Sequence, residues 1–137
     1  MDLNINSPAY YTRKFGVDDE IYWFCRELSG FVKEKNYSDI ITIIGLVPII
    51  APKEELDKGL WKENKKCEPK YGFASVSLQI DYEKYVGANM DDKKALIIKN
   101  VVDSVKAVKS KGKIDFNLFK KDMMRFCEVN GIKYICE

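Results

Sequence analysis

The stretch IITIIGLVPIIAP, residues 40–52, is the most apolar run in a chain of 137 residues that is 32% charged. Its length falls short of the roughly 20 residues that a membrane-spanning helix needs. Four isoleucines and a threonine open it, and β-branched side chains favour strands. We therefore expect an inner strand over 39–44 that is buried on both faces, a bend at Gly45, and a second extended piece over 46–50.

Three other segments carry apolar residues at the spacing of one helix face. Acidic residues stand at or before the start of each, where they cap a helix or interact favourably with its dipole. Asp91 or Asp92 is the expected N-cap of the second helix, and Asp115 is that of the third. Gly112, in the C′ role, and Gly131 are placed to end these two helices. The expected helices cover residues 17–35, 91–110 and 116–129.

Alternation of apolar and polar residues predicts strands elsewhere. Residues 73–82, FASVSLQIDY, are typical of a half-buried strand of an antiparallel sheet. Shorter strands are expected at 2–6 and 132–136, whereas the highly charged stretch 53–70 is expected to be an exposed connection that includes a short helix. The elements show no regular βαβ alternation. We therefore predict one α+β domain over residues 1–137, an antiparallel or mixed β-sheet with about three helices packed mainly on one face.

The residue types that are missing restrict the chemistry. The chain has no histidine, which excludes Ser–His and Cys–His nucleophile pairs, histidine-ligated metals and histidine general bases. Its glycines form neither GxGxxG nor GxxxxGK[ST], the phosphate-binding patterns of two nucleotide-site classes. We therefore expect no catalytic residue, no cofactor and no metal.

The cysteines and the amino terminus indicate a compartment. The four cysteines show no CxxC spacing, and the opening residues, MDLNINSPAYY, lack the basic start and apolar core of a secretory signal. Reduced thiols are typical of the cytoplasm. We expect a cytoplasmic protein with no membrane partner, and the formal net charge of +2 does not indicate a polyanion partner.

Two charged clusters each carry a functional alternative. Asp81 and Glu83 stand two residues apart at a strand end, where they would share a face and form the carboxylate pair of a small hydrolase. Six lysines between residues 106 and 121 flank the junction of the last two helices and predict either a solvated surface or a nucleic-acid-binding module. Acids among them, such as Asp115, favour the solvated surface. The lysines are Lys106, Lys109, Lys111, Lys113, Lys120 and Lys121.

Several aromatic residues lie off the apolar stripes. Tyr22 and Trp23 fall between two stripe residues, Trp61 lies in the charged connection, and Tyr82 and Tyr85 follow the alternating strand. Trp and Tyr beside charged residues are the types that anchor protein interfaces. For Trp23 and Tyr82 we favour packing over the sheet edge or in a second core. For Trp61, packing and a role as an interface anchor are equally expected.

Three segments carry patterns of a known family. They are YSDIITIIGLVPIIAPKEELDKGLWKE (37–63), FASVSLQIDYEKY (73–85) and KGKIDFNLFKKDMMRF (111–126). They resemble immunity protein family 44 of bacterial polymorphic-toxin systems, and the resemblance extends over about residues 7–127. GKIDF, residues 112–116, stands in place of a G-x-F-D-Y-like pattern, with Ile114 and Phe116 at its aromatic positions.

The resemblance implies a small cytoplasmic protein, encoded beside a toxin, that binds this cognate toxin and silences it without catalysis. Such a protein would bury an interface of about 1,600 Å² in total through aromatic and charged anchors. A homo-oligomer is left open. The alternative functions are a nucleic-acid-binding or regulatory module that uses the basic surface around residues 106–121, and a small hydrolase that uses carboxylates or cysteine. The residues predicted to bind the toxin are Trp61, Lys62, Glu63, Asp81, Tyr82 and Glu83.

Overall fold

The computed structural model describes residues 1–6, 9–10, 19–33, 35–59 and 62–136. Their strands are β1 (Asp2–Ile5), β2 (Ala9–Tyr10), β3 (Ile43–Leu46), β4 (Ile49–Ile50), β5 (Asn64–Glu68) and β6 (Phe73–Ser77). Four of them form a mixed sheet in the order β1-β3-β6-β5. The first three strands of this order run parallel, and β5 runs antiparallel to β6. The short strands β2 and β4 pair separately, in parallel.

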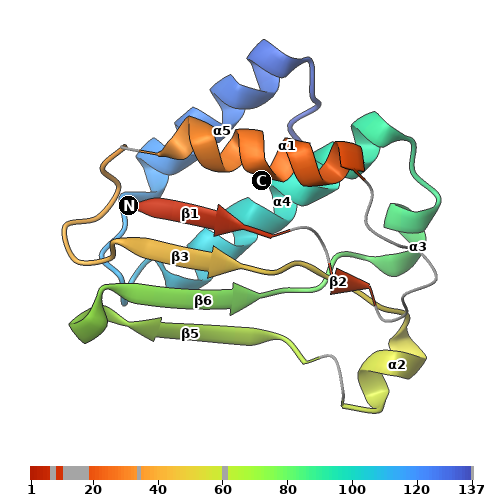
Figure 1. Cartoon of the computed structure of the whole chain (residues 1–137), viewed down its shortest axis with the longest axis horizontal. Helices are drawn as coiled ribbons and strands as arrows, with labels where there is room; N and C mark the ends of the chain where they lie inside the picture. The colour runs from red at the N-terminus through yellow and green to blue at the C-terminus, as the bar shows by residue number, and fades with distance from the viewer. Residues whose placement is uncertain (7–8, 11–18, 34, 60–61, 137) are drawn as a thin grey trace.

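The helices lie mainly on one side of the sheet. In the described parts of the chain they are α1 (Asp19–Val32), α2 (Lys53–Asp57), α3 (Tyr82–Val86), α4 (Met90–Val108) and α5 (Phe116–Asn130), together with the 3-10 turn η2 (Pro69–Tyr71). Figure 1 shows α4 crossing behind the four-stranded sheet, α1 running alongside β1, and α5 beside both helices. The short helices α2 and α3 lie near the end of the sheet at which β6 finishes. The expected α+β fold with a mixed sheet is confirmed.

Alternation along the strands sorts side chains between a covered and an open face. In the four-stranded sheet, the strand residues buried beneath the helices are Leu3, Ile5, Ile44, Leu46, Cys67, Ala74 and Val76. Ile43 and Phe73 are register partners on neighbouring strands and point the other way, with 39% and 36% of their surface exposed. No described helix covers this second face (Figure 1). The hydrophobic core therefore lies between the sheet and the helices.

The strand at the centre of the apolar run differs from its prediction. It begins at Ile43 rather than at residue 39, because the N–H groups of Ile40 and Ile41 donate to Ser38 Oγ (3.2 and 3.0 Å) and form a turn. Gly45 lies inside β3 and is not a bend. The inner position between β1 and β6 is confirmed, but burial on both faces is wrong, because Ile43 faces the open side.

The charged stretch 53–70 holds more structure than predicted. The short helix exists as α2, but the rest is not merely a connection, because Asn64–Glu68 form edge strand β5. Only Cys67 of this strand is buried, so its sequence shows no alternation of apolar residues. Residues 73–82 likewise form a shorter strand, β6, followed by helix α3, and 132–136 form no strand. The first strand, β1, agrees with its prediction.

The structure confirms some of the predicted helix caps and contradicts others. Asp115 Oδ1 accepts a hydrogen bond from Leu118 N–H at the start of α5, and Gly131 ends that helix with a φ of 66°, as predicted. Helix α4 is capped by Asn89, whose Oδ1 accepts from Asp92 N–H (2.9 Å), so the expected Asp91 or Asp92 cap is wrong. Gly112 is not in the C′ role either, because Lys109 caps this end.

Gly112 is required for close packing, and its replacement by alanine is expected to destabilise the protein. An added Cβ would lie 3.0 Å from both Ile41 Cγ1 and Val108 O. Overpacking of this kind lowers the free energy of unfolding by about 1–3 kcal/mol. The matched control is Gly30→Ala in α1, where a Cβ meets no described atom within 4 Å and the free energy of unfolding is expected to rise by up to about 1 kcal/mol. Urea denaturation that finds the two variants equally stable would contradict this account.

Candidate functional site

Two adjoining clefts lie beyond the carboxyl end of β6, and we call them the first and second clefts. The first has a volume of about 370 Å³ and the second of about 710 Å³. Gln79 and Asp81 line both clefts and therefore form the ridge that they share. The first is lined by Glu63, Leu78, Gln79, Ile80, Asp81, Lys84, Leu96, Lys99, Asn100 and Asp103. The second is lined by Ala51, Pro52, Lys53, Glu54, Leu56, Asp57, Gln79, Asp81, Tyr82 and Glu83.

Local hydrogen bonds fix the acidic residues of this region. Asp81 is the N-cap of α3, and its Oδ1 accepts from the Lys84 backbone N–H (2.9 Å). This cap places Tyr82 and Glu83 in the first turn of α3. Glu63 lies just before β5, and its Oε2 accepts from Gln79 N–H (3.0 Å). The antiparallel pairing of β5 with β6 thus brings Glu63 beside the segment that leads to Asp81.

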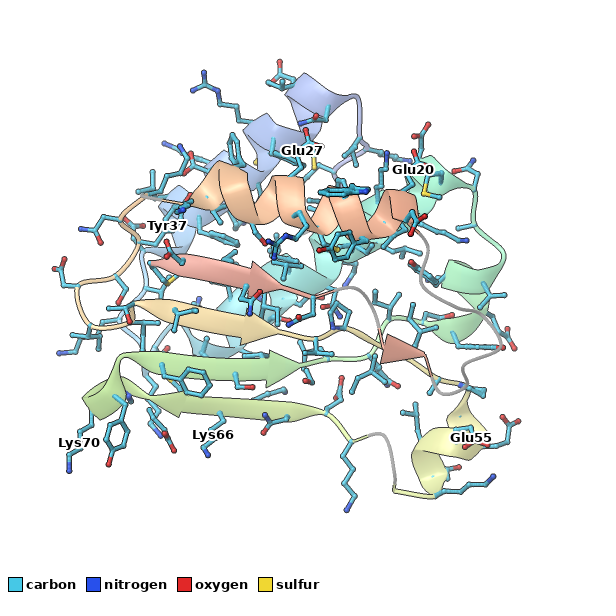
Figure 2. All side chains as sticks on the ribbon, viewed as in Figure 1. Glu20, Glu27, Tyr37, Glu55, Lys66 and Lys70 are labelled. Atoms are coloured by element: carbon cyan, nitrogen blue, oxygen red, sulfur yellow. The ribbon has the colours of Figure 1, made fainter. Side chains whose placement is uncertain are left out.

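The two clefts form an acidic surface on a chain that is slightly basic overall. Their lining residues include six carboxylates and three lysines, a formal charge of −3, whereas the whole chain carries +2. One of the lysines, Lys99, is engaged by Asp103 at 2.7 Å. Figure 2 shows Glu55 of α2 toward this end of the molecule, and Lys66 and Lys70 toward the opposite end.

The lining of the first cleft includes a buried amide. Asn100 belongs to α4 and is only 5% exposed. Its Nδ2 donates to Leu78 O (2.9 Å), which fixes the orientation of the amide. Its Oδ1 is buried and has no hydrogen-bond partner among the described residues. A polar residue among the buried apolar positions of α4 is the sequence signal that would have found it.

The structure gathers most of the residues predicted to bind a partner. Glu63 and Asp81 line the first cleft, and Asp81, Tyr82 and Glu83 line the second. Lys62 is exposed and belongs to neither lining. Trp61 lies outside the described residues. Further acids that the sequence analysis did not single out for this site are Glu54, Asp57 and Asp103.

The aromatic residues of α1 differ from the prediction. Trp23 is 66% exposed, so the packed position that we favoured for it is wrong. It contacts its neighbour Tyr22 edge-on, with 5.2 Å between the ring centroids. Tyr82 is half-buried, in agreement with partial packing. An exposed tryptophan is one of the residue types found at interface anchors.

The carboxylate pair of the hydrolase alternative was predicted on one face of a strand, and that placement is wrong. Asp81 and Glu83 lie in a helix cap and a first helical turn, not on one face of a strand. Among residues 1–6, 9–10, 19–33, 35–59 and 62–136, no three Cys, Asp or Glu side chains are grouped so that they would hold a metal ion. The Cys25 and Cys127 thiols are buried, and burial raises the pKa of Cys25 to about 12 and that of Cys127 to about 11.

Native-state labelling is expected to leave Cys25 and Cys127 unmodified. The thiolate is the nucleophile, and at pH 8 a thiol with a pKa of about 12 is ionised only to about one part in ten thousand. Burial adds a steric block that is lifted only by opening of the fold. Iodoacetamide labelling followed by peptide mass spectrometry should therefore find both sites modified in denaturant and protected without it. Rapid native labelling of either thiol would show that this part of the core is open.

Two of the lysines between residues 106 and 121 pack against an aromatic ring. The Nζ atoms of Lys109 and Lys120 lie 5.1 and 5.9 Å from the centroid of the Phe116 ring. Asp122, on the same helix as Lys120, accepts a hydrogen bond from the Tyr37 hydroxyl (2.6 Å). Burial and this carboxylate raise the pKa of Tyr37. The region is a mixed surface, with cations grouped around one half-buried aromatic ring.

The chain belongs to the immunity protein 44 family, whose sequence model matches residues 1–129. Immunity-protein families are generally non-enzymatic and imply a toxin as partner. No curated protein and no solved structure matches the chain. Within the described parts of the chain, no helix is both long and apolar enough to cross a membrane.

Proposed function

We propose that the protein neutralises one cognate toxin, encoded beside it, by forming a stoichiometric complex. The observation that carries this proposal is the family match over residues 1–129. A binding protein needs a surface rather than a reaction centre, and a stable complex buries about 800 Å² on each partner. We propose further that the chain is a single domain without catalytic residues. We also propose that it acts in the cytoplasm, where free thiols such as these four stay reduced.

The acidic double cleft is the proposed contact surface. It combines concave shape, a local excess of negative charge and the half-buried ring of Tyr82. Complementary charge increases the association rate and excludes wrong partners. Glu63, Asp81 and Glu83 are the proposed charged contacts, together with Lys62. Trp61, next to Lys62 in the sequence, is proposed as an aromatic anchor on the strength of its residue type alone.

Coexpression with the product of the neighbouring toxin gene tests the proposal. We expect growth to be rescued when the two genes are expressed together, and a catalytically inactivated toxin to copurify with the protein in a 1:1 ratio. Size-exclusion chromatography with light scattering measures that ratio and also reveals any homo-oligomer. Failure of both rescue and copurification would refute the proposal.

The nucleic-acid alternative depends on the cluster of Lys109, Lys120 and Phe116. Cations around an aromatic ring are a feature of single-strand binding sites. Such binding weakens steeply with salt, because neutralised phosphates release counterions. Fluorescence polarisation with a labelled oligonucleotide at low salt would detect it. We expect no binding, and a salt-dependent signal lost in Lys109→Glu would favour this alternative.

A further inference from the structure

We propose that the first cleft receives the guanidinium group of one arginine side chain of the toxin. The cleft would hold it between Glu63 and Asp81, above the amide oxygen of Asn100. This inference rests on the proposed function and names the chemistry by which the partner is recognised. It makes Glu63 and Asp81 determinants of affinity and of partner choice.

The unpaired amide oxygen of Asn100 is the first observation that points to a ligand. Buried polar atoms in proteins almost always have a hydrogen-bond partner. Asn100 is 95% buried and lines the cleft, its Nδ2 is bonded to Leu78 O, and its Oδ1 has no partner within the described residues. Because the amide is fixed by the Leu78 bond, Oδ1 is left as an acceptor that a donor from outside the described chain would satisfy.

The carboxylates around this amide can also accept further hydrogen bonds. Glu63 Oε2 and Asp81 Oδ1 each accept one backbone N–H from within the chain. In the described parts of the chain, neither residue forms an ion pair. A third carboxylate, Asp103, is already paired with Lys99. Lys84 also lines the cleft, so its three carboxylates and two lysines leave a formal charge of −1 beside the acceptor oxygens.

Arginine has the complementary chemistry. A guanidinium carries five N–H donors in a rigid planar fork, accepts no hydrogen bond and keeps its charge at any physiological pH. A cleft of about 370 Å³ falls in the size range of sites that enclose a small organic group. Leu78, Ile80 and Leu96 supply apolar lining for the methylene stem.

The second cleft explains why the arginine should belong to a protein. It continues from the shared residues Gln79 and Asp81 and is larger, at about 710 Å³. Four carboxylates and one lysine line it, so it favours a chain segment that is basic around the inserted arginine. A free cation would use the first cleft alone, whereas a toxin segment would occupy both.

The test compares two matched double variants for binding to the catalytically inactivated toxin. Glu63→Gln with Asp81→Asn removes both charges, and each new amide retains an oxygen that accepts the same backbone N–H. The control, Glu27→Gln with Glu128→Gln, removes two charges from exposed positions on α1 and α5. We expect about 10- to 100-fold weaker binding for the cleft variant and less than threefold change for the control. Melting temperatures of both variants should match that of the parent protein.

An arginine scan of the toxin completes the experiment. One Arg→Ala change should weaken binding to the parent protein but not further weaken binding to the cleft variant, as coupled partners require. If the parent protein binds and the cleft variant binds equally well, the inference is wrong while the proposed function stands. If coupling is found with a toxin lysine instead, the guanidinium assignment is wrong. If the parent protein neither binds the toxin nor rescues growth, the proposed function itself fails.

Discussion

Changing Glu63 and Glu83 together to lysine is expected to weaken toxin binding by at least about 100-fold, since reversal replaces attraction with like-charge repulsion. Both side chains are exposed and line the acidic double cleft, one in each half. Isothermal titration calorimetry with the inactivated toxin measures the loss, and growth rescue by the same variant should fail.

The control for this reversal keeps the change in net charge and alters only its position. Glu27→Lys with Glu128→Lys places two lysines at exposed sites on α1 and α5. If binding were governed by net charge alone, both double variants would weaken it equally. That result would contradict a localised acidic contact surface.

Replacing Phe119 by alanine is expected to lower the free energy of unfolding by about 3–5 kcal/mol. The Phe119 side chain is fully buried on α5, and its ring contacts that of Tyr37 edge-to-face with 5.3 Å between centroids. The change leaves a cavity and removes support for the hydrogen bond from Tyr37 to Asp122. Chemical denaturation measures the loss.

The adjacent residue supplies the control for this core substitution. Leu118 is on the same helix and is 40% exposed. Leu118→Ala is expected to lower the free energy of unfolding by less than about 1 kcal/mol, because shortening an exposed side chain leaves no buried cavity. Equal losses for the two variants would mean that α5 does not pack as described.

The long helices could be predicted because their signals are local. The apolar stripes of α1, α4 and α5 recur within a few residues, and Asp115 and Gly131 mark the ends of α5 in the sequence itself. The alternation that defines β6 is equally local. These elements therefore appear in the structure near their predicted positions.

The elements that were missed depend on distant partners. Strand β5 has the sequence NKKCE, and only its pairing with β6 makes it a strand. The isoleucines at the centre of the apolar run looked buried on both sides, but whether a helix covers the second face is decided by packing elsewhere. The sequence alone contains no signal for that coverage.

The candidate site likewise contains some residues that are neighbours in the sequence and others that only the fold brings together. Asp81, Tyr82 and Glu83 were proposed together because they are neighbours in sequence. Glu63 joins them only through the register of β5 against β6 and its bond to Gln79 N–H. Asn100 comes from α4, far along the chain. Its unpaired oxygen could not be predicted, because it depends on the hydrogen bond between the Asn100 amide and Leu78 O.

Hydrogen–deuterium exchange of the protein, free and bound to its inactivated toxin, tests the central claim most directly. We predict that added protection is concentrated in residues 51–57, 62–63 and 78–86, which hold all the cleft-lining residues outside α4. Segment 106–121 and the open face around Ile43 and Phe73 should exchange at unchanged rates. Protection at either of those surfaces, with none at the clefts, would contradict the proposed mode of binding.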